Sequence, residues 1–230
     1  MADYKQEIKD AITYAECLKF DKHHPWHRNL VALYCSLIEY SDSLVYLVEN
    51  GKGISVPLVF RGLLEAYVDF KNLSEDKLYS YNMEASYTKE WLKVIEEASQ
   101  KNNAFLAEIG EVPELKDQTQ EHKDKLADLR NKGYTPLNQF EKFNKAGMVQ
   151  EYRSIYNFMC SHSHNNIRSL IDRFFIINNA ENDFELALFK DQEPSEFDHY
   201  LVTGKHFLRN GSHNIHAVLE TGYERKFPVV

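Results

Sequence analysis

One segment, residues 55–73, constrains the fold more than any other. It reads SVPLVFRGLLEAYVDFKNL and is the most hydrophobic segment of the chain. Ser55 stands where a helix cap is favoured, and Pro57 falls in the first turn. Apolar side chains occupy almost every direction around such a helix, so it has to be buried inside a fold. The segment therefore predicts a core helix.

The polar residues of this helix gather on a single stripe. At spacings of four, four and three, the stripe consists of Arg61, Glu65, Asp69 and Asn72. Charged groups on a buried helix are either paired inside the fold or line a groove. Because Arg61 and Glu65 can pair at i,i+4, a structural ion pair and a functional site both remain open.

The rest of the chain is also patterned for helices, because glycine and proline are few and stand between apolar-periodic segments. Besides the core helix, we expect helices at about 3–21, 25–50, 76–101, 148–163 and 195–223, the last with a break at 209–212. Residues 173–189, RFFIINNAENDFELALF, suit a small β-hairpin, with a helix as the alternative. The expected fold is all-α: a single-domain bundle over residues 1–230 of about seven or eight helices.

Residues 113–132 form the most polar of these helical segments. They read PELKDQTQEHKDKLADLRNK and contain few apolar side chains. A helix that is polar nearly all round does not belong in a core. We therefore expect a charged helical arm at about 113–132 within the single domain.

Charge and hydropathy exclude several classes of function. The net charge is −8, which disfavours generic binding to DNA or to any other phosphate backbone. The first residues, MADYKQEIKD, lack the apolar core of a secretory signal, and no run approaches the ~20 apolar residues of a membrane span. We expect a cytoplasmic protein that does not enter the membrane.

A second cluster of reactive residues occupies positions 156–166, which read YNFMCSHSHNN at the end of a helical pattern. On a helix, His162 and His164 point about 200° apart, so they cannot bind one ion together. The sequence also lacks a CxxC pair, a phosphate-binding glycine loop and a nucleophile elbow. We therefore expect no metal and no cofactor.

Helical geometry gives this second helix two faces. Counted at about 100° per residue, the polar and reactive face consists of Arg153, Tyr156, Asn157, Cys160 and His164. The opposite face has the composition of a core-facing stripe and consists of Ile155, Phe158, Met159 and His162. The polar face either lies in solvent or faces the charged stripe of the core helix.

The two helices together resemble the signature of a widespread, uncharacterised bacterial family, catalogued as domain of unknown function 5677. Its members have Arg-x3-Glu in a hydrophobic helix and later Tyr-x3-Ser-x3-His. This chain has Arg61 and Glu65, then Tyr156 and His164, and departs from the pattern at Cys160, where the family usually has serine. The resemblance implies an all-helical fold in which the two helices face each other, and it implies no agreed activity.

A more distant likeness is to the helical nucleases of prokaryotic defence and toxin systems, the HEPN superfamily. Their dimers cut RNA with an Arg-x4–6-His motif. The segment RNGSHNIH supplies that spacing with Arg209 and His216. About one such match is expected by chance in a chain of this composition, so the match carries almost no information.

Two hypotheses follow for function. In the first, the chain is a non-catalytic binding or interaction module, and a buried Arg/Glu/Tyr/His network fixes the packing of its two helices. Its function would then reside in a surface, for example a homodimer interface.

In the second hypothesis, the same residues form a metal-independent ribonuclease of a bacterial toxin or phage-defence system. His164 would move protons, Arg61 would hold phosphate and Glu65 would orient one of them. The catalytic set would be Arg61, Glu65, Tyr156 and His164, with Asp69, Arg153 and Cys160 as binding residues. RNA would be the partner, and the acidic net charge counts against it.

Overall fold

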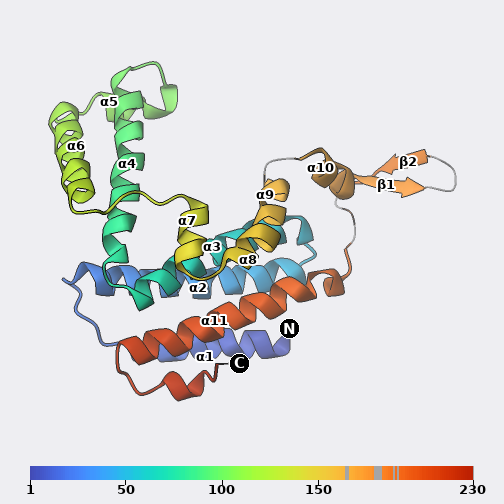
Figure 1. Cartoon of the computed structure of the whole chain (residues 1–230). Helices are drawn as coiled ribbons and strands as arrows, with labels where there is room; N and C mark the ends of the chain where they lie inside the picture. The colour runs from blue at the N-terminus through green and yellow to red at the C-terminus, as the bar shows by residue number, and fades with distance from the viewer. Residues whose placement is uncertain (164–165, 179–182, 189, 191, 230) are drawn as a thin grey trace. The chain divides into compact units, whose positions relative to one another are not determined.

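The computed structural model describes residues 1–163, 166–178, 183–188, 190 and 192–229 (Figure 1). The predictions for His164 and for the side chain of His162 fall outside this described part. The regular secondary structure of the described chain is helical except for one two-stranded antiparallel sheet, so the predicted all-α fold with a small hairpin is confirmed. The chain divides into two compact units, Met1–Glu75 with Phe143–Val230, and Asp76–Lys142. That they form one domain stays a prediction.

The first unit is a bundle around three long helices. α2 (Pro25–Glu49) packs along α3 (Val56–Glu75), and α11 (Asp198–Val218) packs against both (Figure 1). α1 (Ala2–Ala15) packs on α11 and α2 and ends well before residue 21, where the first helix was expected to end. Short 3-10 turns flank the long helices at Gly53–Ser55, Pro194–Phe197 and Glu224–Lys226.

α3 forms the centre of this bundle, as its composition predicts. Its largest side chains are almost completely removed from solvent, among them Phe60, Leu63, Leu64, Phe70 and Leu73. The preceding helix ends where expected, because Gly51 adopts a positive φ of 65° that other residues rarely tolerate.

α2 is the one helix in the described part that is long and apolar enough to cross a membrane. One side of α2 is buried against α3 and α11, and Leu30, Leu37 and Leu44 on that side have no exposed surface. A core helix meets the same criteria of length and composition as a membrane span. The composition of α2 is therefore weak support for a membrane location.

α11 runs unbroken through Gly211, so the predicted break at 209–212 is wrong. A Cβ atom at Gly211 would approach the Cδ1 of Leu37 to 2.6 Å, and one at Gly204 would approach the Oη of Tyr4 to 2.7 Å. These glycines allow α11 to approach its neighbours closely. Their role is in packing between helices.

The remaining elements of the first unit follow α7 (Gln139–Lys145). A helical segment consists of α8 (Val149–Glu151), a π-helical turn at Tyr152–Tyr156, and α9 (Asn157–Ser163), which packs on α3. α10 (Ile167–Phe174) leads into β1 (Phe175–Asn178). β1 pairs antiparallel with β2 (Asp183–Leu186), Phe175 opposite Leu186, so the hairpin predicted near 173–189 is present.

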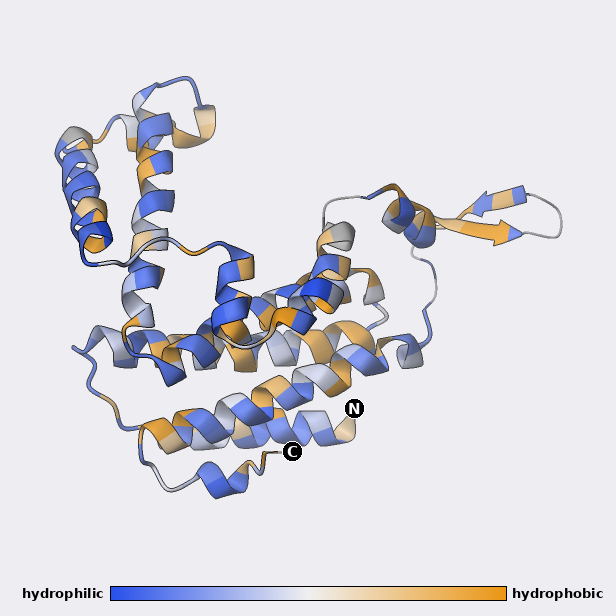
Figure 2. Cartoon of the chain, viewed as in Figure 1, coloured by the Kyte–Doolittle hydropathy of each residue, from blue (hydrophilic) through white to orange (hydrophobic). Residues whose placement is uncertain are grey.

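The second unit is a pair of helices, α4 (Tyr79–Ser99) and α6 (Leu115–Asn131), joined through a 3-10 turn at Ala104–Leu106 and α5 (Ala107–Gly110). α6 is the predicted charged helix, and Figure 2 shows it as mostly hydrophilic. Its leucines still pack toward α4: Leu126 and Leu129 contact Ala85 and Leu92. The arm is thus one partner of a helical pair.

At the C-terminal end of α11, His216 lies in an aromatic cluster. The imidazole is fully buried, stacks parallel to the Phe227 ring at 5.7 Å, and lies edge-on to Tyr14. Its Nδ1 is 2.7 Å from the Thr221 hydroxyl, and its Nε2 has no hydrogen-bond partner among the described residues. Burial lowers the pKa of His216, and the opposing charge of Glu224 does not restore it.

This shift predicts a loss of stability in mild acid. The pKa of His216 lies below 6.5 in the folded chain and near 6.5 when unfolded. As the pH falls toward and below 6.5, the unfolded chain takes up the proton first, so the free energy of unfolding decreases; well above 6.5 this residue has no effect. Urea denaturation between about pH 7.5 and 5.5 should show this decrease.

The control for this prediction is His216→Phe, which keeps an aromatic ring on Phe227. Its free energy of unfolding should depend less on pH over the same interval. The other titratable groups, His199 among them, are unchanged in the variant, so the difference between the two slopes reports His216 alone. Equal slopes for the wild type and the variant would show that His216 does not set the dependence.

Candidate functional site

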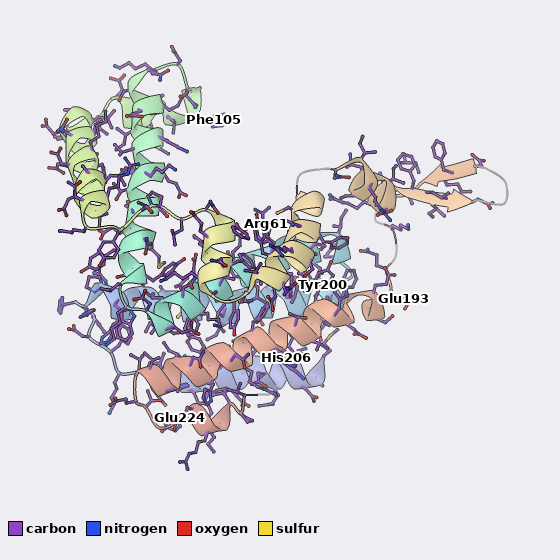
Figure 3. The ribbon with its side chains drawn as sticks, viewed as in Figure 1. Arg61, Phe105, Glu193, Tyr200, His206 and Glu224 are labelled. Atoms are coloured by element: carbon purple, nitrogen blue, oxygen red, sulfur yellow. The ribbon has the colours of Figure 1, made fainter. Side chains whose placement is uncertain are left out.

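The polar stripe of α3 reaches the surface at the side where α9 packs. The side chains of Arg61 and Glu65 keep 25% and 30% of their surface exposed, although most of the apolar side chains of α3 are buried. Figure 3 shows Arg61 on α3 beside α9. One turn from the end of α3, the Nζ of Lys71 donates to the Ala146 carbonyl at 2.9 Å. This bond ties α3 to the turn from which the α8–α9 segment begins.

The π-helical turn sets which residues of the α8–α9 segment face α3. In such a turn each N–H bonds five residues back, so the faces of the following helix are rotated from those of a regular α-helix. Tyr152 and Tyr156 stack at 5.2 Å, and both rings contact Phe143. Tyr156 is consequently buried, with 4% of its surface exposed.

Tyr156, Arg61 and Glu65 form a closed triangle of hydrogen bonds. Arg61 Nε donates to Glu65 Oε1 at 2.9 Å, and Arg61 Nη2 donates to the Tyr156 hydroxyl at 3.2 Å. The Tyr156 hydroxyl in turn donates to the same Oε1 at 3.0 Å. The guanidinium also lies over the Tyr156 ring, 5.3 Å from its centre. We call these three residues the interhelical network.

The charges of the network keep Tyr156 and Arg61 in one protonation state each. Burial, the charge of Glu65 and the bond to it raise the pKa of Tyr156 far above its usual value, although Arg61 opposes the shift. Partial burial lowers the pKa of Arg61, but the hydrogen bond and charge of Glu65 outweigh it and raise the pKa. Tyr156 therefore remains a neutral donor and Arg61 a cation near neutral pH.

The other predicted site residues are placed differently. Cys160 is half-buried and close enough to affect the pKa of both Arg61 and Tyr156, so it adjoins the network. Asp69 is half-buried two turns beyond Arg61 on α3. Arg153 is exposed, whereas Tyr156 of the same predicted face is buried, and a binding role for Arg153 stays a prediction. His164 lies outside the described residues, and its role stays a prediction.

The predicted core-facing stripe of this helix is also only partly correct. Met159 is buried, but 55% of the Phe158 surface is exposed. The π turn rotates the helix so that Tyr156 and Met159 face α3, and Phe158 points to the side. The side chain of His162 is not among those described.

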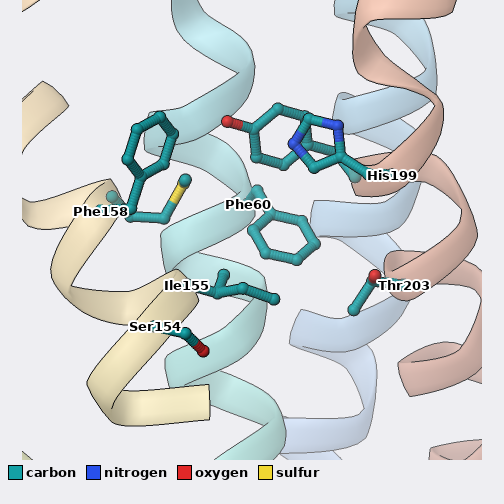
Figure 4. Close-up of a pocket in the computed structure, with 8 residues that line it drawn as sticks. Phe60, Ser154, Ile155, Phe158, His199 and Thr203 are labelled. Atoms are coloured by element: carbon teal, nitrogen blue, oxygen red, sulfur yellow. The ribbon is translucent and has the colours of Figure 1, made fainter. Parts of the chain in front are cut away.

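On that side lies a pocket that sequence reasoning missed. It has a volume of about 260 Å³ and a mainly apolar lining from α3, the π turn, α9 and α11 (Figure 4). The lining residues are Phe60, Ser154, Ile155, Phe158, Met159, His199, Tyr200 and Thr203. Only the helical periodicity of each segment was available from the sequence, and periodicity does not reveal which helices meet.

Arg209 and His216, the residues of the chance nuclease-like spacing, have separate surroundings. Arg209 Nε lies 3.1 Å from both carboxylate oxygens of Glu7, and Nη2 also donates to that carboxylate. His216 lies in the aromatic cluster. In the part of the chain that the structure covers, no group of three or more His, Cys, Asp or Glu side chains is arranged to hold a metal ion.

The interhelical network lies within a region that matches a protein-family model. The model is described as a family of unknown function, DUF5677, and it matches residues 27–183. The chain belongs to the DUF5677 family. The resemblance predicted from the two helices is therefore confirmed. The interhelical network of this DUF5677 protein lies within the matched region. α1 and α11 lie outside it, and so does the wall of the pocket that α11 forms.

No curated protein and no solved structure matches the chain. The likeness to HEPN nucleases thus rests only on the Arg209 and His216 spacing.

Proposed function

We propose that this DUF5677 protein is a non-catalytic binding module, in which the interhelical network holds α9 on α3 and so shapes the binding surface of the first unit. The closed triangle of Arg61, Glu65 and Tyr156 carries this proposal. The three groups are hydrogen-bonded to one another across the two helices, as expected of a network that fixes packing.

The protonation states support the same function. A general acid or base works best with a pKa near the operating pH. The pKa values of Tyr156 and Arg61 are both shifted upward, away from neutrality. The net charge of −8 also disfavours a nucleic-acid ligand. We place the module in the cytoplasm, because the apolar side of α2 is occupied by α3 and α11.

A metal-independent ribonuclease is the second candidate, and one observation favours it. Arg61 and Glu65 keep about a quarter of their side-chain surface exposed, at 25% and 30%, so a phosphate could reach the guanidinium from solvent. In that case His164 would supply the proton transfer that the described residues of the network do not.

Tyr156→Phe tests whether the network fixes packing. The change removes a hydroxyl that accepts from Arg61 and donates to Glu65. We expect the free energy of unfolding to fall by about 1–2 kcal/mol in urea denaturation, because both partners stay partly buried with one bond fewer. The matched control is Tyr46→Phe on α2, whose side chain is 62% exposed and should change stability by less than about 0.5 kcal/mol.

Incubation with RNA separates the two candidates. The purified wild-type protein should leave single-stranded RNA intact in the presence of a chelator, as should Arg61→Ala. Cleavage by the wild type and by Tyr46→Phe, but not by Arg61→Ala, would contradict the binding module and establish the ribonuclease. The outcome does not depend on the stability of Tyr156→Phe.

A further inference from the structure

The pocket beside α9 has a deep apolar floor. Phe60, Met159 and Tyr200 line it with 1%, 1% and 5% of their surface exposed. The rings of Phe60 and Tyr200 pack edge to face with 5.1 Å between their centres, which holds this floor in place. Phe158, which is largely exposed, forms one edge of the mouth. Water in such a pocket has few polar partners, so an apolar ligand can displace it favourably.

The volume limits the size of that ligand. An apolar cavity of about 150 Å³ is enough to bind benzene, and sites for drug-sized molecules begin near 300 Å³. At about 260 Å³, this pocket has room for a fused pair of rings and little more. Aromatic walls and the Met159 sulfur favour a planar aromatic ligand over an aliphatic one.

Polar groups occur only at the α11 side and the rim. His199 packs on the Tyr200 ring with 3.8 Å between ring centres, and Figure 4 shows it on the α11 side of the pocket. Partial burial lowers the pKa of His199, although the backbone of Glu196 and the charge of Asp198 oppose the shift. The imidazole is therefore neutral at pH 7, and one of its two ring nitrogens is an acceptor.

We propose that this pocket binds a small planar aromatic molecule that carries one N–H or O–H donor, with the rings between Phe60 and Phe158 and the donor directed to His199. Indole is the model ligand. The inference rests on the proposed function in treating the first unit as a binder, and it adds the class of ligand. The network enters only by holding α9, and with it Phe158 and Met159, as one wall.

Calorimetric titration of the full chain with indole and with 1-methylindole tests the site. Indole should bind saturably with one molecule per chain. Thr203→Phe places a ring in the pocket from α11 and should weaken binding at least about tenfold, because the occupied space is no longer available. Val202→Phe adds the same ring at the neighbouring position, which is 51% exposed and outside the lining, and should bind indole as the wild type does.

His199→Phe tests the hydrogen bond separately from packing. It should weaken indole binding about fivefold, the effect of one hydrogen bond, and leave 1-methylindole, which has no donor, unaffected. If Thr203→Phe fails to fold, as judged by circular dichroism, Ser154→Phe blocks the pocket from the opposite rim. Absence of saturable binding, or equal binding to the blocked variant and to Val202→Phe, overturns the proposal.

The two proposals can fail independently. Cleavage of RNA that depends on Arg61 would overturn the binding module whatever the titration gives. Lack of indole binding with intact RNA and a destabilised Tyr156→Phe would overturn only the ligand assignment.

Discussion

Arg209→Ala should lower the free energy of unfolding by about 2–3 kcal/mol, because it leaves a buried carboxylate without its partner. Glu7 on α1 is 8% exposed and accepts hydrogen bonds from two nitrogens of Arg209 on α11. Solvent reaches part of the guanidinium, whose side chain is 23% exposed, so the effect is smaller than for a fully buried pair. Urea denaturation of the purified variant measures it.

A double variant shows whether the loss comes from the orphaned charge or from lost packing. Glu7→Leu with Arg209→Met replaces the pair by apolar groups and should regain most of the stability, since a buried pair adds little over good apolar packing. Lys5→Ala is the matched control on α1. Lys5 pairs with Glu49 at 2.9 Å with both side chains at least 36% exposed, so its loss should change stability by less than about 1 kcal/mol. If Arg209→Ala and Lys5→Ala lost similar amounts of stability, the burial of Glu7 would not be the cause of the effect.

The core helix and its charged stripe could be predicted because they depend on local order. An uninterrupted helix repeats its faces every 3.6 residues or so, and the i,i+4 pairing of Arg61 with Glu65 requires nothing beyond that helix. The contact with Tyr156 is different, since it joins residues far apart in the chain. It was predicted through the family resemblance, and the helical period of either segment did not specify it.

The errors in the α8–α9 segment have one physical cause. The assumed constant 100° per residue fails at the π turn, so Phe158, assigned to the core-facing stripe, is exposed, and Tyr156, grouped with the exposed Arg153, is buried. A π turn has no distinctive composition that would reveal it in advance.

The predicted helix break at 209–212, around Gly211, was wrong for another reason. Glycine inside a helical pattern indicates a break when only local propensity is considered. Here the glycine serves the packing of α11 on α2: because Gly211 has no side chain, α11 can approach Leu37 of α2 closely. The pocket combines both difficulties: its walls come from three separate segments, and one of them follows the π turn.

Phe60→Ala should have the largest effect on stability, about 3–5 kcal/mol, because it removes a buried aromatic side chain and leaves a cavity. Phe60 is 1% exposed and contacts Tyr200 and Phe207 of α11 from α3. It therefore joins α3 and α11, two of the three helices that line the floor of the pocket. The free energy of unfolding from urea denaturation is the measurement.

Two further substitutions distinguish a cavity from a general effect of losing phenylalanine. Phe105→Ala makes the same chemical change at a side chain that is 99% exposed, and should alter stability by less than about 0.5 kcal/mol. Phe60→Leu keeps most of the buried volume and should lose less than Phe60→Ala. If Phe60→Ala and Phe105→Ala were equally stable, the ring of Phe60 would not be packed between α3 and α11, and the floor assigned to the pocket would be wrong.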